Sequence, residues 1–227
     1  VTARLLADGS EVLAIDDEST PGASLRLLRA THGPTALLNV TPCDLTKRDP
    51  LDGLWGRTPV REIWHLASPA SPPLYKARQR DTLRLGGAVL DALLAKAERD
   101  RARLLFASSS EVYGNAPLEE HPQRESYVGA VSCTGPRSMY DCAKRYGEAM
   151  CLAWHREAGV DVRLPRIFNS FGPGMAREDG RLVTALLGAA LSGEAFAVHG
   201  GGTQTRSLSY VDDTVDGLFR VMRDRDL

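Results

Sequence analysis

The feature that most constrains the fold is an alternation of short apolar runs with longer segments of helical period. Such strand–helix–strand alternation is typical of a parallel sheet covered by helices. The expected strands lack a regular polar alternation, which indicates that both faces of the sheet are buried. The sequence therefore predicts an α/β fold with a doubly wound parallel sheet. Strands are expected at Glu11–Asp16, Ala36–Val40, Val60–Ala67, Arg101–Ser108 and Val160–Phe168, and helices at Leu51–Leu54, Leu83–Arg99 and Ser138–Ala158.

The pattern changes after Phe168. We expect a main domain over residues 1–168 and a smaller C-terminal region over residues 169–227 that is interleaved with it. The second region is expected to hold a helix at Leu182–Leu191, a strand at Phe196–His199, a glycine turn at Gly200–Gly202, a strand at Thr205–Tyr210 and a helix from Asp212 or Asp213 onward.

Both ends of the chain read as interrupted. Val1–Ala7 resembles the second half of a helix that stops at Gly9, and Leu227 lies inside a helical pattern. In a doubly wound fold the strand Glu11–Asp16 would be the second. We therefore expect the first strand and its glycine-rich phosphate turn to lie upstream of Val1, and a further segment to follow Leu227.

Composition excludes several classes of function. A net charge of −1 over 227 residues provides no general attraction to nucleic acid or anionic membrane. No stretch of about 18 apolar residues is present, so no membrane span is expected. The four cysteines (Cys43, Cys133, Cys142 and Cys151) lack metal-ligand spacing, so we expect no metal site and reduced thiols in a cytoplasmic protein.

Acidic residues follow the strand that ends at Asp16-Asp17. A carboxylate at this point can accept hydrogen bonds from both ribose hydroxyls of an adenosine, and it would repel a 2′-phosphate. The position favours NAD over NADP. Asp44-Leu45, after the next strand, is a weaker signal of the same kind, where the carboxylate would meet the adenine amino group.

Tyr140 and Lys144 are four residues apart in a helical pattern, so their side chains share one face. A neighbouring ammonium group favours the phenolate and prepares the tyrosine as a general base. The segment Ser108–Glu111 ends a strand about 30 residues upstream. It would supply hydroxyl groups and a carboxylate at the carboxyl edge of the sheet, where ligands bind.

Taken together, these motifs resemble the extended short-chain dehydrogenase/reductases that act on nucleotide sugars, and within them the UDP-glucuronic acid decarboxylases. The resemblance runs from about Leu5 to Met222. It is carried by His65–Pro73, Ser109–Gly114, His121–Gln123, Gly135–Asp141 with Lys144, Arg166–Pro173, Glu178–Arg181 and Gln204–Ser207.

This resemblance implies a Rossmann domain that binds NAD, a smaller region that holds a UDP-sugar, and a homodimer built on a four-helix bundle of the helices near Leu83–Arg99 and Ser138–Ala158. It also implies the roles of individual residues. The catalytic residues would be Tyr140, Lys144, Ser110, Glu111 and Arg206. The cofactor would be bound by Asp16, Asp17, Thr20, Asp44, Leu45, Leu66, Ala67, Ser68, Ser108, Tyr140 and Lys144. The substrate would be bound by Pro69, Ala70, Asn169, Arg181, Gln204 and Arg206.

Ser110-Glu111 separates the decarboxylases from their relatives. The 4,6-dehydratases place an aspartate before the glutamate as an acid for the leaving hydroxyl, and the 4-epimerases usually have a small residue at the glutamate. The resemblance thus implies conversion of UDP-glucuronate to UDP-xylose through a 4-keto sugar, with NAD recycled. A 4-epimerase, a 4,6-dehydratase and a non-catalytic NAD-binding regulator stay open as alternatives, as do thymidine in place of uridine and release of the 4-keto sugar.

Overall fold

The computed structural model describes residues 1–20, 28, 30–31, 37–47, 53–55, 58–176, 179–198 and 201–224. The chain divides into two compact units. The first holds Val1–Thr58 and Ser170–Val215, and the second holds Pro59–Asn169 and Asp216–Leu227.

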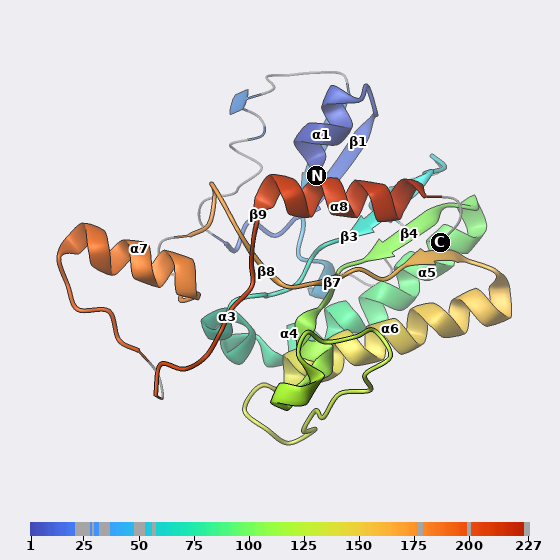
Figure 1. The fold of residues 1–227 in the computed structure, drawn as a ribbon. Helices are drawn as coiled ribbons and strands as arrows, with labels where there is room; N and C mark the ends of the chain where they lie inside the picture. The colour runs from blue at the N-terminus through green and yellow to red at the C-terminus, as the bar shows by residue number, and fades with distance from the viewer. Residues whose placement is uncertain are drawn as a thin grey trace. The chain divides into compact units, whose positions relative to one another are not determined.

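The second unit is built on a three-stranded parallel sheet in the order β3-β4-β6 (Figure 1). The strands are β3 (Glu62–His65), β4 (Arg103–Phe106) and β6 (Asp161–Arg163). Helices connect each strand to the next, as parallel strands require. The expected strand–helix–strand alternation is therefore confirmed in this unit.

Side chains of β3 and β4 alternate between two covered faces. On one face, the Trp64 ring packs against the Phe219 ring of helix α8 (Val211–Arg223), with 4.8 Å between ring centroids and 39° between the ring planes. On the other face, His65 bonds to the carbonyl of Leu85 in helix α4 (Gln79–Gly86), and the Phe106 ring lies against Gly147 of helix α6 (Ser138–Ala158). Leu104, Leu105 and Phe106 are consequently all buried, which explains why the sequence shows no polar alternation here.

The connection from β3 to β4 holds three helices: α3 (Pro72–Ala77), α4 (Gln79–Gly86) and α5 (Ala88–Asp100). The single helix expected over Leu83–Arg99 is wrong, because the chain breaks at Gly87, whose φ of −118° and ψ of −106° are not helical. Helix α3 was not expected. Its first residues are prolines, which are tolerated at the start of a helix because that turn leaves its N–H groups unpaired.

Helix α6 spans Ser138–Ala158, as the sequence predicts, and ends at Gly159 in the left-handed conformation (φ 70°). Two glycines allow close packing at this helix. A Cβ on Gly86 of α4 would lie 2.6 Å from the Ala143 carbonyl oxygen, and a Cβ on Gly147 would lie 2.4 Å from the Phe106 ring. These contacts place the first turns of α6 against α4 and β4.

Two expected strands are each divided in the structure. Arg101–Ser108 becomes β4 and the short β5 (Ser108–Ser109), and Val160–Phe168 becomes β6 and β7 (Arg166–Ile167), which pairs with β5. Pro165 lies at the second break, where a residue without an N–H cannot continue the ladder. The short 3-10 helices η3 (Ser110–Tyr113) and η4 (Leu118–Glu120) follow β5.

The first unit begins with α1 (Thr2–Ala7) and the parallel pair β1 (Val12–Asp16) and β2 (Leu38–Pro42). A 3-10 helix, η1 (Leu45–Lys47), follows β2. These elements agree with the expected helix end at Val1–Ala7 and with the strands at Glu11–Asp16 and Ala36–Val40, apart from Ala36, which lies outside the described residues. The helix expected at Leu51–Leu54 also lies partly outside them.

The later part of the first unit holds α7 (Leu182–Ser192) and a sheet of β8 (Asn169–Phe171) with β9 (Leu208–Tyr210). Helix α7 confirms the prediction. The strand expected at Thr205–Tyr210 begins only at Leu208, and Phe196–Val198 form no strand, because no described residue pairs with these segments in a sheet. His199 and Gly200 lie outside the described residues, and Gly201–Gly202 form part of the expected turn.

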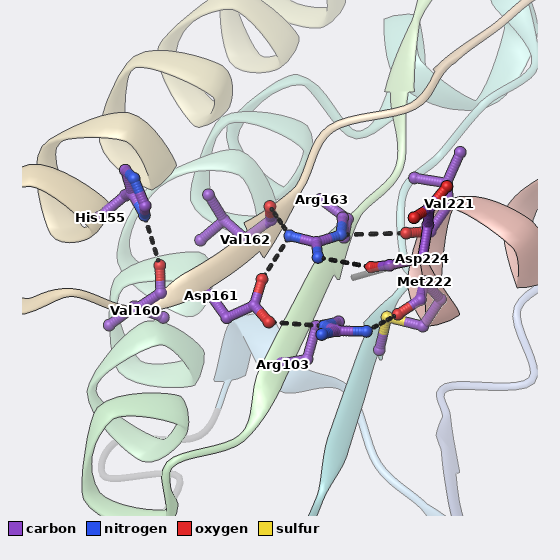
Figure 2. Close-up of polar contacts among 9 residues, drawn as sticks. All are labelled: Arg103, His155, Val160, Asp161, Val162, Arg163, Val221, Met222 and Asp224. Atoms are coloured by element: carbon purple, nitrogen blue, oxygen red, sulfur yellow. Dashed lines mark hydrogen bonds and ion pairs between the residues drawn. The ribbon is translucent and has the colours of Figure 1, made fainter. Parts of the chain in front are cut away.

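Helix α8 (Val211–Arg223) confirms the last expected helix, and its C-terminal end is held by two arginines (Figure 2). Arg163, which is buried, donates to the carbonyl oxygens of Val221 (3.0 Å) and Asp224 (2.9 Å). Arg103 donates to the Met222 carbonyl. Asp161 pairs with both arginines. These bonds satisfy carbonyl groups that a helix end leaves unpaired.

Within the described ranges, no helix is both long enough and apolar enough to cross a membrane.

Candidate active site

Tyr140 and Lys144 are both buried on the face of α6 that packs against the sheet. The Lys144 ammonium donates a 2.7 Å hydrogen bond to the carbonyl oxygen of Ala107, the residue between β4 and β5. The same nitrogen lies 5.6 Å from the centroid of the Tyr140 ring. The four-residue spacing therefore brings the cation beside the phenol at the carboxyl end of β4.

The environment of Lys144 is apolar, with the Phe106 ring centroid 5.0 Å from its ammonium nitrogen. Burial disfavours the charged form and lowers the pKa of Lys144 to about 8. At neutral pH the Lys144 side chain is still protonated in most molecules. A cation held there favours the phenolate of Tyr140, which is the form that a general base needs.

The predicted group of serines and a glutamate lies against α6. Ser109 is the N-cap residue of η3, and its hydroxyl accepts a 3.3 Å hydrogen bond from the backbone N–H of Glu111. Ser108 is buried and donates to a carboxylate oxygen of Glu148 at 2.5 Å. Ser110 opens η3 and is partly exposed. The structure thus confirms that strand end and helix meet; the cofactor contact of Ser108 and the catalytic role of Ser110 stay predictions.

Glu111 is paired with Arg137, a residue that the sequence reasoning did not select. The distance from the Arg137 Nη2 atom to the Glu111 Oε2 atom is 2.5 Å, and both side chains remain partly exposed. Arg137 is the residue directly before α6 and lies three positions before Tyr140. The spacing on the helix could have identified it, whereas its pairing with Glu111 depends on the loop between η3 and α6.

Tyr75 of α3 completes the surroundings of Tyr140. The two rings stack with 5.0 Å between centroids and an interplanar angle of 23°. Tyr75 is only 2% exposed, and burial raises its pKa. Its hydroxyl has no hydrogen-bond partner among the described residues. Because α3 was not expected, no sequence signal pointed to this residue.

A second polar network holds the end of β5 next to the site. Arg166 of β7 binds both carboxylate oxygens of Glu148, at 2.9 and 2.8 Å, and donates to the Tyr113 hydroxyl at 3.0 Å. Glu148 lies four residues after Lys144 on α6, so the helical spacing that linked Tyr140 to Lys144 also points to it. The network ties β5, β7 and α6 together.

The segment Leu66–Ala70 follows β3, which ends at His65, two residues before the expected strand end at Ala67. Leu66, Ala67 and Ala70 are exposed, Ser68 is partly exposed and Pro69 is buried. The preceding His65 is buried, and desolvation lowers its pKa to about 4, so the neutral ring donates to the Leu85 carbonyl at 2.8 Å. His65 therefore has a structural role, and the ligand contacts of residues 66–70 stay predictions.

Five predicted cofactor residues lie in the first unit. Asp16 is exposed at the end of β1 and accepts a hydrogen bond from the Glu18 N–H at 2.7 Å. Asp17 and Thr20 are exposed in the same turn, and Leu45 is buried in η1. Asp44 caps η1: although burial opposes it, hydrogen bonds from Lys47 and Thr46 lower the pKa of Asp44 to about 2.

The predicted substrate residues after β7 are Asn169, Arg181, Gln204 and Arg206. Asn169 is exposed at the start of β8. In the first unit, Arg181 forms an ion pair with buried Asp179, including a 2.9 Å contact from Nη2 to Oδ2. Gln204 and Arg206 are exposed, and Arg206 donates to the neighbouring Thr205 carbonyl at 2.7 Å. The roles of these residues stay predictions.

Each unit holds a residue that suits a ribose of a nicotinamide dinucleotide. In the first unit, the exposed Asp16 carboxylate at the end of β1 suits the ribose hydroxyls of an adenosine. The buried Lys144 cation at the end of β4 suits a second ribose, because an ammonium group carries three donors.

Comparison with known proteins also indicates a protein that binds NAD. A model of the NAD dependent epimerase/dehydratase family matches residues 1–227. The chain is 42% identical over 222 residues to UDP-glucuronic acid decarboxylase 1 of Danio rerio, which covers 98% of this chain and 50% of that protein. It is 46% identical over 167 residues to UDP-glucuronic acid decarboxylase 5 of Arabidopsis thaliana, which covers 74% and 48%. The chain thus spans about half the length of these relatives.

Among solved structures, the chain is similar to a UDP-N-acetylglucosamine 4-epimerase from Methanobrevibacter ruminantium M1 in complex with UDP-N-acetylmuramic acid. The TM-score is 0.79 at 25% identity, over 95% of this chain and 66% of the other. The expected fold class, a doubly wound α/β fold, is confirmed by this likeness together with the parallel sheets.

Proposed function

The chain belongs to the NAD dependent epimerase/dehydratase family, and on that basis we propose that it converts UDP-glucuronate to UDP-xylose and CO2. The curated relatives described above are UDP-glucuronic acid decarboxylases, and they support the substrate and the reaction. The single observation that carries the proposal is the position of Ser110 and Glu111. Glu111 pairs with Arg137, and Arg137 lies over the ring of Tyr75, which stacks on Tyr140. By the resemblance, Ser110 stands where a dehydratase would have an aspartate.

Bound NAD would accept a hydride from C4 of the sugar and later return it. Tyr140, as phenolate, takes the proton of the C4 hydroxyl, because a ketone forms only when that proton leaves together with the hydride. Lys144 lowers the cost of the phenolate through its charge and holds a ribose of the cofactor. The same tyrosine returns the proton when the ketone is reduced.

Loss of the carboxylate needs an electron sink more than a strong acid. The C4 ketone supplies that sink, because C–C cleavage places the electron pair in the enolate. Glu111 and Ser110 orient the carboxylate and the water that reprotonates C5. By the resemblance, Arg206 would stabilise the charge that develops at C5. In this proposal Asn169, Arg181 and Gln204 bind the UDP-sugar.

Glu111→Gln separates this reaction from its closest alternatives. The protein, purified and supplied with NAD and UDP-glucuronate, is expected to release CO2, and the variant is expected to release it about 10²-fold more slowly. Glu119→Gln, in an exposed part of η4, is the control and should keep the wild-type rate. A wild-type protein that only inverts C4 would be an epimerase, and one that binds NAD without any turnover would be a regulator.

We also propose that the protein forms a homodimer through a four-helix bundle of α4–α5 and α6 from two copies. Tyr146 is 56% exposed and Leu83 is 46% exposed on these helices. A groove of about 460 Å³ runs along α5 and α6, lined in part by Asp91, Met150 and Trp154.

We further propose a cytoplasmic location for the protein, since all four cysteines are free thiols.

A further inference from the structure

Buried polar atoms without partners gather beside Tyr140. Among the described residues four buried side-chain atoms lack a hydrogen-bond partner, and three of them are Tyr75 Oη, Arg137 Nε and Asp141 Oδ1. Native structures contain few such atoms because each destabilises the fold. Their concentration at one place indicates that the arrangement is retained for a reason other than stability.

Arg137 is shared between two carboxylates of unequal distance. Its Nη2 atom lies 2.5 Å from Glu111 Oε2, whereas its Nε atom lies 4.0 Å from Asp141 Oδ1. Arg137 also lies over the Tyr75 ring, 5.9 Å from its centroid. One guanidinium group thus links a residue of η3, a residue of α3 and a residue of α6.

Asp141 has an unfavourable place for a carboxylate. It lies in the first turn of α6, and its side chain is only 15% exposed. Burial raises its pKa to about 6; Arg137 opposes this rise and Glu111 adds to it. The other titratable groups that face Asp141 are Tyr75 and Cys142. Asp141 therefore changes its charge near pH 6.

We infer that Asp141 is a positioning residue for the reaction proposed above: its ionised carboxylate draws the Arg137 guanidinium from its Nε side and so loosens the hold of Arg137 on Glu111. With Asp141 neutral, Glu111 is the sole carboxylate partner of the guanidinium at this place and stays withdrawn from the sugar. With Asp141 charged, Glu111 is released more readily from Arg137 toward the sugar. The inference rests on the proposed function only for its effect on turnover.

The coupling is tested without turnover by a 13C NMR titration of the Asp141 carboxyl group. In the wild-type protein the midpoint is expected near the pKa of about 6, well above the ordinary value. Glu111→Gln removes a like charge and should lower the midpoint, whereas Arg137→Gln should raise it. An Asp141 midpoint near 3.8 that is the same in the wild type and in both variants would overturn the inference, whichever reaction the protein catalyses.

The effect on turnover is tested with Asp141→Asn, which is neutral at every pH. The kcat at pH 8 is expected to fall about fivefold with little change in KM, as the loss of one partly exposed ion pair implies. The wild-type kcat should fall by the same factor below pH 6, and the variant should lack this inflection. An unchanged pH profile in Asp141→Asn would contradict the inference.

Two controls separate positioning from structure. Asp81→Asn removes another first-turn aspartate, one paired with Arg78 at 3.1 Å, and should leave the pH profile unchanged. Because the folded protein disfavours the charged form of Asp141, Asp141→Asn should raise the Tm at pH 8. A purely structural residue would lower the Tm when replaced. Absence of CO2 release from the wild type would defeat the proposed function and leave the NMR result to decide the coupling.

Discussion

Lys144 is a buried cation whose cost to the fold depends on pH. Its pKa is about 8 in the folded protein and 10.5 when exposed, so between these values the unfolded chain binds more protons. Stability from this group therefore rises as the pH increases from 8 to 10.5, by roughly 3 kcal/mol in total. Relative to Lys144→Met, the wild-type free energy of unfolding should rise by this amount, as measured by urea denaturation at both pH values.

Lys76→Met is the matched control, because Lys76 is an exposed lysine in the last turn of α3. Its free-energy difference from the wild type should vary little with pH. If the Lys144→Met difference is equally flat, the side chain is not buried as described.

Residue spacing predicts which side chains share one face of a helix, but it does not predict their contacts with other elements. Tyr140 and Lys144 share a face of α6 because they are four residues apart, and the same rule reaches Glu148. Tyr75 comes from a helix about 65 residues upstream, and its stacking on Tyr140 has no local signal. The pairing of Arg137 with Glu111 depends on a loop conformation that the sequence pattern does not specify.

Among the elements, helix α6 depends on a glycine at its contact with β4. In Gly147→Ala the new methyl group would meet the Phe106 ring at 2.4 Å and a Leu90 methyl at 3.2 Å. Overpacking of this kind costs about 1–3 kcal/mol. The loss should appear as a lower midpoint in urea denaturation.

Gly188→Ala gives the opposite expectation from the same substitution. Gly188 lies inside α7, and a Cβ there would meet nothing within 4 Å. Alanine favours the helix by about 1 kcal/mol over glycine, so this variant should be slightly more stable. Equal effects of the two substitutions would show that the packing at Phe106 is not tight.

The C-terminal end of α8 depends on Arg163. Arg163→Ala removes the donors to the Val221 and Asp224 carbonyls (Figure 2) and should cost about 2–3 kcal/mol. Hydrogen exchange of the last-turn amides of α8 should accelerate. Arg156→Ala, an exposed arginine in the last turn of α6, should change stability by no more than about 0.5 kcal/mol. Unchanged exchange in Arg163→Ala would show that the helix end is held by other contacts.

Elements were predictable where the chain signals its own boundaries. Helix α6 ends at Gly159 as a left-handed glycine requires, and α7 ends likewise at Gly193. The division of α4 from α5 at Gly87 was not predictable, because the apolar period continues across it. The strand prediction was wrong at Phe196–Val198 and Thr205–Ser207. Residues with a high strand propensity form a strand only where a partner strand is available.

For the whole molecule, the proposed homodimer predicts that charge on the exposed face of α4–α6 prevents association. Tyr146→Asp places a carboxylate on this face and should shift the sedimentation of the protein from dimer to monomer. Leu118→Asp alters a residue that is 87% exposed outside this face and should sediment as the wild type. A wild-type monomer at all concentrations would refute the dimer. The division of roles between residues 1–168 and 169–227 stays a prediction.

The central claim, decarboxylation with internal recycling of NAD, is tested most directly with UDP-glucuronate labelled with 13C at the carboxyl carbon. With the purified protein and NAD, NMR is expected to show one labelled CO2 or bicarbonate for each UDP-pentose formed, without net formation of NADH. Labelled carboxylate that stays on the sugar while C4 inverts, or a substrate that stays unchanged, would contradict the claim.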